Sequence, residues 1–145
     1  MVKVQLEDRQ LFGVTVRTNN QNECGSAGKI GALWQSVFGE IMQKPREKEA
    51  LFGVYSSYES DCQGDYDYSV AIEESVGLAG ETSMMIPAGE YLRFEKSGEC
   101  PTACMELWQE IWEYFERSDS PRRKYAVDFE EYVSKTDVAI YIGIL

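Results

Sequence analysis

One order of predicted elements occurs twice along the chain and constrains its fold more than any other feature. In the first half, residues 11–18 alternate apolar and polar side chains as a half-buried strand does, and apolar residues then recur at helical spacing over 30–42. Strands over 52–60 and 66–73 follow, joined by a Gly-containing loop. The second half repeats this order, with a strand over 90–96, a helix over 102–117 and strands over 125–133 and 138–144.

Matched dipeptides support a duplication. Leu33-Trp34 and Leu107-Trp108 fall at equivalent places in the two predicted helices, each after a loop that contains a Glu-Cys dipeptide. Residues 1–7 are expected to add a strand before the first unit, and Ser26 is expected to cap the first helix. We interpret the chain as two β-α-β-β units, with pseudo-repeats of about 1–75 and 80–145.

The expected fold class is α+β. A single β-α-β-β unit cannot bury its own sheet, so the two units are expected to form one curved antiparallel sheet with two helices on one side and a ligand cleft between the halves. The sheet face away from the helices is expected to be the concave, ligand-facing surface. With 145 residues, of which 43% are hydrophobic, the chain has the size of a single domain over 1–145.

The charge balance disfavours several partner classes. A net charge of −11 repels nucleic acid and anionic membrane surfaces and favours cations. The one basic run, Arg122, Arg123 and Lys124, is expected to be a solvated loop. The chain has no histidine, which excludes serine-histidine triads and HExxH zinc sites. We predict neither a metal site nor a cofactor.

The cysteines and the termini indicate a cytoplasmic location. Cys24, Cys62, Cys100 and Cys104 form no CxxC pair, and we expect them to be buried, reduced thiols. The first ten residues lack the hydrophobic region of a signal peptide, and no stretch of 18 apolar residues occurs.

Strand alternation selects the residues expected to face the cleft. If Val127 and Phe129 pack against the helices, Glu130 and Tyr132 point the other way, into the cleft. Applied to the other strands, the same rule turns further tyrosines and one more carboxylate toward that surface. Trp34 and Trp108 are expected in the core, whereas Trp112 lies where a helix edge can overhang the cleft. The candidate ligand-binding residues are Glu130, Tyr91, Tyr141, Tyr55, Glu59, Trp112 and Tyr132.

Tyrosines around a carboxylate suit an organic cation. Aromatic faces attract positive charge by roughly 0.5 to 2 kcal/mol per contact, and a desolvated carboxylate adds an attraction that water would otherwise screen. The expected ligand is therefore a small, cationic, amphipathic organic molecule.

The motifs resemble those of the GyrI-like effector-binding domains, which also occur in AraC-type and MerR-type multidrug regulators. The resemblance rests on the segment of residues 86–94 (IPAGEYLRF), on the sequence LWQEIW in the second helix, and on Asp128-Phe-Glu-Glu-Tyr132 and the last strand. In the first half it rests on residues 16–19, on Leu33-Trp34 and on residues 52–59. It implies a duplicated β-α-β-β fold with a pocket between the halves and a buried glutamate at Glu130.

The resemblance is to stand-alone members, including proteins carried on integron cassettes, since the effector-like pattern begins at residue 1. We therefore expect ligand binding without direct DNA binding and, on balance, without catalysis. One alternative is a small-molecule hydrolase that acts on reactive electrophiles through Glu130. Another is an acidic protein-interaction surface for a basic partner.

Overall fold

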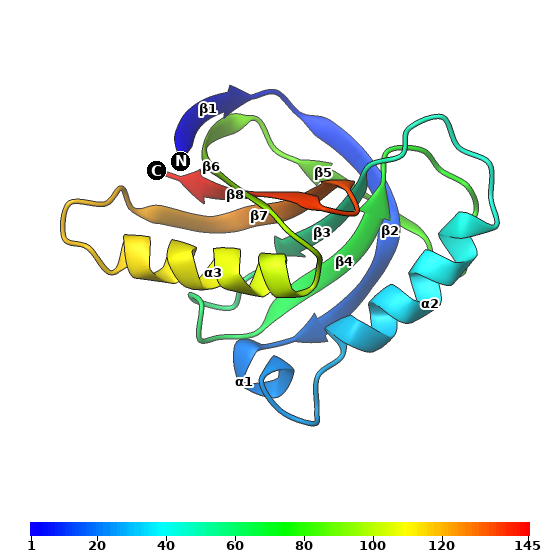
Figure 1. Ribbon diagram of the computed structural model, residues 1–145, viewed down its shortest axis with the longest axis horizontal. Helices are drawn as coiled ribbons and strands as arrows, with labels where there is room; N and C mark the ends of the chain where they lie inside the picture. Colours follow the sequence, from blue (N-terminus) through cyan, green and yellow to red (C-terminus); the bar gives the residue numbers. More distant parts are fainter.

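The computed structural model describes residues 1–145 as one eight-stranded antiparallel sheet with three helices (Figure 1). The predicted α+β class and its duplicated architecture are confirmed. The elements in chain order are β1 (Val2–Leu6), β2 (Arg9–Thr18), α1 (Asn20–Glu23), α2 (Ile30–Met42), β3 (Leu51–Ser56), β4 (Tyr66–Ile72), β5 (Thr82–Ile86), β6 (Gly89–Ser97), α3 (Thr102–Phe115), β7 (Arg123–Ser134) and β8 (Asp137–Ile144). None of the helices is long and apolar enough to cross a membrane.

The strand order shows how the two halves join. The order β1-β6-β8-β7-β3-β4-β2-β5 reads equivalently from either edge, with β7 and β3 paired at the centre. The short strand β5, which the sequence pattern did not predict, is the counterpart of β1. Each of these edge strands pairs with the other half, β1 with β6 and β5 with β2. The halves are therefore interlocked at the edges of the sheet as well as at its centre.

Both long helices pack on the same face of the sheet. Helix α3 buries Leu107 and Ile111 against residues of β6 and β8, among them Ile140. Helix α2 buries Val37 and Ile41 against β4 and the neighbouring segments. Figure 1 shows the two helices apart from each other, with the middle of the sheet between them. The middle of this face is therefore not covered by either helix.

The opposite face of the sheet is also a hydrophobic core, which corrects the predicted arrangement. The curved sheet brings β1, β2, β5 and β6 around the far side of β3 and β7, where Phe52, Val54 and Phe129 are buried. The prediction that Val127 and Phe129 pack against the helices, and that the far face is the open one, is wrong. Both faces carry apolar side chains, so alternation within one strand does not tell which face the helices cover.

Strand pairing confirms the assignment of the faces. Glu130 lies opposite Ile140, and Phe129 lies opposite Tyr141. Directly paired residues of antiparallel strands project to the same side. Ile140 packs on α3 as predicted, so Glu130 also points toward the helices.

The start of α2 differs from the prediction that Ser26 caps it. The chain first forms the short helix α1, whose cap residue Asn19 accepts a hydrogen bond from the backbone N–H of Asn22 at 2.8 Å. Helix α2 then begins at Ile30. The carboxylate of Glu23 accepts the backbone N–H groups of Lys29 and Ile30 at 2.8 and 3.1 Å, which satisfies donors that the helix leaves free.

Candidate functional site

A single large cavity of about 1270 Å³ lies between α2 and α3, over the central strands of the sheet. Strands β3 and β4 contribute to its lining together with β7, and more than half of the lining residues are apolar. The predicted cleft between the halves is therefore present, but on the side of the helices. Specific ligand pockets commonly enclose roughly 300–1,000 Å³, so the cavity has room for a bulky organic molecule.

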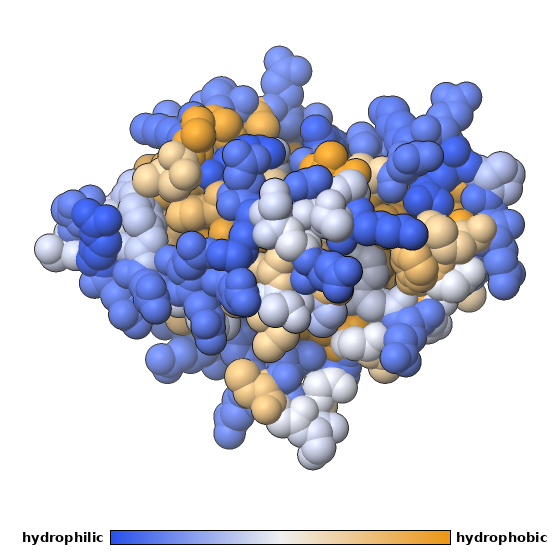
Figure 2. Space-filling view, in the orientation of Figure 1, coloured by the Kyte–Doolittle hydropathy of each residue, from blue (hydrophilic) through white to orange (hydrophobic).

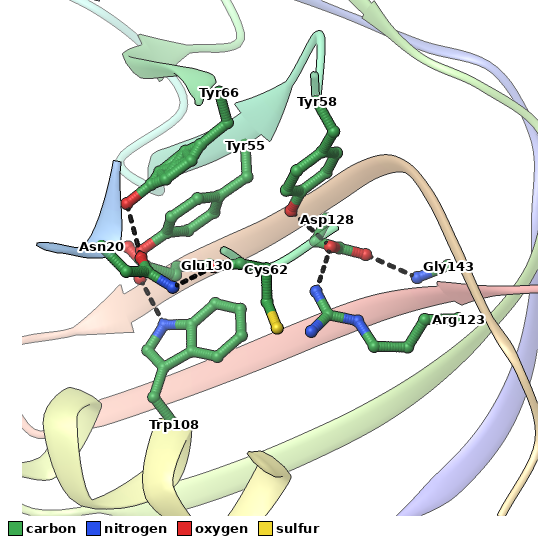
Figure 3. Close-up of polar contacts among 10 residues, drawn as sticks. All are labelled: Asn20, Tyr55, Tyr58, Cys62, Tyr66, Trp108, Arg123, Asp128, Glu130 and Gly143. Atoms are coloured by element: carbon green, nitrogen blue, oxygen red, sulfur yellow. Dashed lines mark hydrogen bonds and ion pairs between the residues drawn. The ribbon is translucent and has the colours of Figure 1, made fainter. Parts of the chain in front are cut away.

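Glu130 lies on the inner wall of this cavity and is 2% exposed. Its Oε1 accepts the hydroxyls of Tyr68 and Tyr132, each at 2.9 Å. Its Oε2 accepts the hydroxyl of Tyr55 at 2.9 Å and the indole N–H of Trp108 at 2.7 Å (Figure 3). The thiol of Cys104 also donates to Oε2, at 3.4 Å. Five uncharged donors thus surround one buried carboxylate.

A glycine makes the room that this carboxylate occupies. Gly53 of β3 is paired directly with Glu130 of β7, at the junction of the two halves. A Cβ atom at position 53 would overlap both the Tyr68 hydroxyl and the Glu130 Oε1. Only glycine leaves the space in which this hydroxyl and this carboxylate meet.

The tyrosines around Glu130 stay protonated. Burial, reinforced by the negative charge of Glu130, raises the pKa of Tyr55, Tyr68 and Tyr132 well above its usual value. Their hydroxyls therefore remain neutral donors across the physiological range. No lysine or arginine forms an ion pair with Glu130, so the cavity wall holds a carboxylate with hydrogen-bond donors but without a counter-charge.

A second buried carboxylate belongs to a different arrangement. Asp128, fully buried, accepts the Tyr58 hydroxyl at 2.5 Å, the Arg123 guanidinium at 2.7 Å and the backbone N–H of Gly143 at 2.9 Å. Arg123 neutralises it, and the Arg123 side chain is only 6% exposed. The expectation that Arg123 belongs to a solvated loop is therefore wrong, because Asp128 draws it inward.

Four of the seven candidate residues line the cavity: Glu130, Tyr55, Tyr132 and Trp112. Trp112 lies at the mouth and is 40% exposed. Four other exposed apolar side chains line the same cavity, namely Phe38, Met42, Met105 and Val133. Figure 2 shows apolar colour reaching the surface along α2 within a mostly hydrophilic face. The mouth is thus bordered by apolar groups of both helices.

The other three candidates do not line the cavity. Tyr91 and Tyr141 lie on the far face of the sheet, where Tyr141 stacks on Phe129 with ring centres 4.5 Å apart. Glu59 lies beyond the end of β3 and is exposed. The prediction that Tyr55 and Tyr91 share one wall assumes that every strand turns its apolar side chains toward the helices. That assumption fails at β3 and β7, because Tyr55, Glu130 and Tyr132 lie on the helix side whereas the apolar Phe52 and Phe129 are buried on the far face.

Several lining residues were missed by the sequence analysis. Trp108 is buried in the core and Trp34 packs against it, as predicted, but both also line the cavity, together with Tyr58, Tyr66 and Tyr68. The signal that indicates them is chemical: a buried indole N–H or tyrosine hydroxyl requires a partner, and a carboxylate is the strongest one available.

All four cysteines line the cavity as free thiols, which corrects the expectation that all are buried. Cys104 is buried, Cys62 and Cys100 are half-buried, and Cys24 is exposed. Burial, followed by the charge of Glu130, raises the pKa of the Cys104 thiol. No three histidine, cysteine or carboxylate side chains are placed together as a metal site would need.

The comparisons with known proteins agree with this architecture. The model of a family described as Cass2, integron-associated effector binding protein, matches residues 4–144. An integron cassette protein from the mobile metagenome of Vibrio cholerae superposes with a TM-score of 0.93 at 30% identity, covering 99% of this chain and 95% of that one.

Two further relatives are more distant. The proposed transcriptional regulator YobU of Bacillus subtilis (strain 168) is 26% identical, over 96% of this chain and 94% of its own. The structure of SAV2435 bound to tetraphenylphosphonium superposes with a TM-score of 0.74 at 21% identity, covering 99% of this chain and 93% of that one. At this identity the likeness concerns the fold.

Proposed function

Because this chain belongs to the integron-associated effector binding family, we propose that its effector is a bulky, lipophilic organic cation bound in the cavity beside Glu130. Direct DNA binding is not part of the proposal, since a net charge of −11 opposes contact with phosphates. The same charge favours the approach of a cation.

The observation that carries the proposal is the state of Glu130. Five neutral donors stabilise its charged form, yet no cationic side chain pairs with it. A buried charge that lacks a counter-ion in a low-dielectric environment attracts an opposite charge more strongly than an exposed one does. A ligand cation in the cavity supplies the missing counter-charge.

The lining supports a cation that carries apolar groups. Tyr55 packs edge-on against Tyr68 and Trp108, with ring centres 4.9 and 5.2 Å away, so aromatic rings rather than the carboxylate oxygens form much of the contact surface. Cations bind over such rings with roughly 0.5–2 kcal/mol per contact. The tetraphenylphosphonium bound by SAV2435 is a cation of this kind, and it motivates the choice of probe.

Hydrolysis through Glu130 has weaker support from the geometry. A carboxylate offers about four lone-pair sites, and five donors already occupy both of its oxygens. A general base must accept a proton from water, which requires one of these hydrogen bonds to break. The hydrogen bonds that already occupy Glu130 leave no free position for a water molecule at its oxygens.

The direct test compares two ions of nearly the same shape and opposite charge. Titration calorimetry with tetraphenylphosphonium and with tetraphenylborate is expected to give saturable binding of the cation and at least about tenfold weaker binding of the anion. Glu130→Gln is expected to weaken the phosphonium affinity by about tenfold, which corresponds to about 1.4 kcal/mol.

The matched control is Glu131→Gln. Glu131 is the next residue of β7, lies on the other face of the sheet and contacts Arg9 and Tyr141 instead of the cavity. Its substitution removes the same charge and should leave the affinity within about twofold. Equal binding of the two ions, or equal effects of the two substitutions, would show that Glu130 does not select the ligand.

A further inference from the structure

The cavity has a second polar end, separate from Glu130. Around it lie Tyr58, Cys62, Tyr66 and Arg123, which line the cavity where the β3–β4 loop approaches the start of β7. In Figure 3 Arg123 lies to the right beside Asp128, Tyr58 and Cys62 lie nearer the middle, and Tyr66 lies to the left, on the same side as Glu130 and Trp108. The cavity volume of about 1270 Å³ exceeds what one compact cation fills, so a ligand that extends beyond Glu130 meets this end.

Arg123 carries the unusual feature of this end. Its guanidinium donates one hydrogen bond, from Nη2 to Asp128 Oδ2 at 2.7 Å. The Nε is buried and has no acceptor, and Nη1 forms no hydrogen bond within the protein either. Figure 3 shows this second terminal nitrogen directed away from Asp128, to the side of Cys62. Buried donors without acceptors are rare and costly in folded proteins.

The position of the guanidinium is fixed by its surroundings. Its carbon lies 4.5 Å from the ring centre of Tyr125 and 5.7 Å from that of Phe115. Burial is the largest single influence and opposes its charge, but the charge and hydrogen bond of Asp128, together with Tyr58 and Tyr125, raise the pKa of Arg123. Arg123 is therefore a permanently charged, positioned donor.

The neighbouring polar groups are already paired. Tyr58 donates to Asp128, and Tyr66 donates to Asn20 at 2.8 Å. Asn20 in turn donates to the Cys62 carbonyl at 2.9 Å. The donors that remain unused at this end belong to Arg123, whereas the oxygens of Glu130 are saturated by donors. The two ends thus offer opposite chemistry.

We infer that Arg123 forms a second subsite, which accepts an uncharged oxygen of the ligand, such as a carbonyl. The acceptor is neutral because Asp128 already balances the charge of Arg123, and because the buried Glu130 carboxylate, which has no ion-pair partner, disfavours an anionic group on the same ligand. This inference rests on the proposed binding of a cation near Glu130 and adds a second feature to the ligand. The ligand then combines a lipophilic cation with a carbonyl group some distance from it.

The test uses matched probes. Triphenylphosphonium cations with an alkyl chain that ends in a primary amide are compared with chains of equal length that end in a methyl group, over a short series of lengths. At the length that reaches Arg123, the amide probe is expected to bind about tenfold more tightly, as a hydrogen bond from a charged donor predicts. If all amide and methyl probes bind equally, the subsite is refuted while the proposed function stands. If no phosphonium binds at all, the proposed function itself fails.

Arg123→Lys separates Arg123 from other sources of preference. Lysine keeps the positive charge beside Asp128 but lacks the additional guanidinium donors. The amide preference should fall to within about twofold while the methyl probe binds as before. Arg93→Lys is the control, because Arg93 bonds Tyr141 on the far face of the sheet. A preference that survives Arg123→Lys would overturn the assignment.

A spectroscopic measurement on the wild-type protein covers the case in which Arg123→Lys does not fold. The ¹⁵N-labelled guanidinium resonances of Arg123 are expected to shift when the amide probe is added and to stay closer to their free positions with the methyl probe. Identical spectra with the two probes would contradict the subsite.

Discussion

Trp34 and Trp108 occupy equivalent positions in the two halves, and both direct an indole N–H into the hydrogen-bond network of Glu130. Trp108 donates to the carboxylate itself at 2.7 Å, whereas Trp34 donates at 2.8 Å to the hydroxyl of Tyr68, which then donates to Glu130 at 2.9 Å. The duplicated helices thus converge on one carboxylate that belongs to the second half. The two halves have equivalent elements, but only the second half carries the carboxylate, so the two tryptophans have different hydrogen-bond partners.

This asymmetry predicts unequal costs for the same substitution. Trp108→Phe removes a buried donor from a charged acceptor and is expected to lower the free energy of unfolding by about 2–3 kcal/mol. Trp34→Phe removes a neutral hydrogen bond at a half-buried position and should cost about 1 kcal/mol. Urea denaturation followed by circular dichroism measures both. Equal costs would mean that the indole N–H of Trp108 contributes nothing beyond its packing.

Gly53→Ala tests the space opposite Glu130. The added methyl group would overlap the Tyr68 hydroxyl and Glu130, so we expect a loss of about 1–3 kcal/mol in the free energy of unfolding, together with weaker tetraphenylphosphonium binding. The control is Gly39→Ala on α2, where no atom lies within 4 Å of the new Cβ. There the change should stabilise the protein by roughly 0.5–1 kcal/mol. A harmless Gly53→Ala would contradict the described packing.

Glu130 was found from sequence because alternation sets it apart from Val127 and Phe129, and this relation holds in the structure. The identity of the face did not follow, since the curved sheet buries apolar side chains on both sides. The pairing of Glu130 with Gly53 and with Ile140 decides it, and this pairing joins segments that are distant in sequence. Strand β5 was not predicted for a similar reason, because it is short and its partner β2 lies in the other half.

The protonated tyrosines predict how stability depends on pH. The pKa of Tyr68 is raised in the folded state, so above the unfolded value of about 10 the unfolded chain loses the proton first. This contribution to stability is complete below pH about 10 and is lost as the pH rises further, by roughly 1.4 kcal/mol per pH unit for each such tyrosine.

Urea denaturation at a series of alkaline pH values measures this slope. Tyr68→Phe should reduce the dependence of the unfolding free energy on pH by the contribution of one tyrosine. Ile72→Val, a change in the same buried cluster that removes no ionisable group, should lower stability without altering the slope. A slope that is unchanged in Tyr68→Phe would rule out the raised pKa.

The four cavity thiols are expected to react in a set order, because reactivity depends on exposure and on the fraction of thiolate. Cys24 is exposed and should be alkylated first by iodoacetamide at mildly alkaline pH. Cys104 is buried, its pKa is raised by burial and by Glu130, and it should react last, after Cys100, whose pKa burial also raises. Peptide mass spectrometry over a time course resolves the order, and denatured protein, in which all four react at similar rates, is the control.

Saturating tetraphenylphosphonium should slow Cys100 and Cys104 more than Cys24, because Cys104 contacts Glu130 directly whereas Cys24 lies at the surface. Equal protection of Cys24 and Cys104 would place the cation away from Glu130.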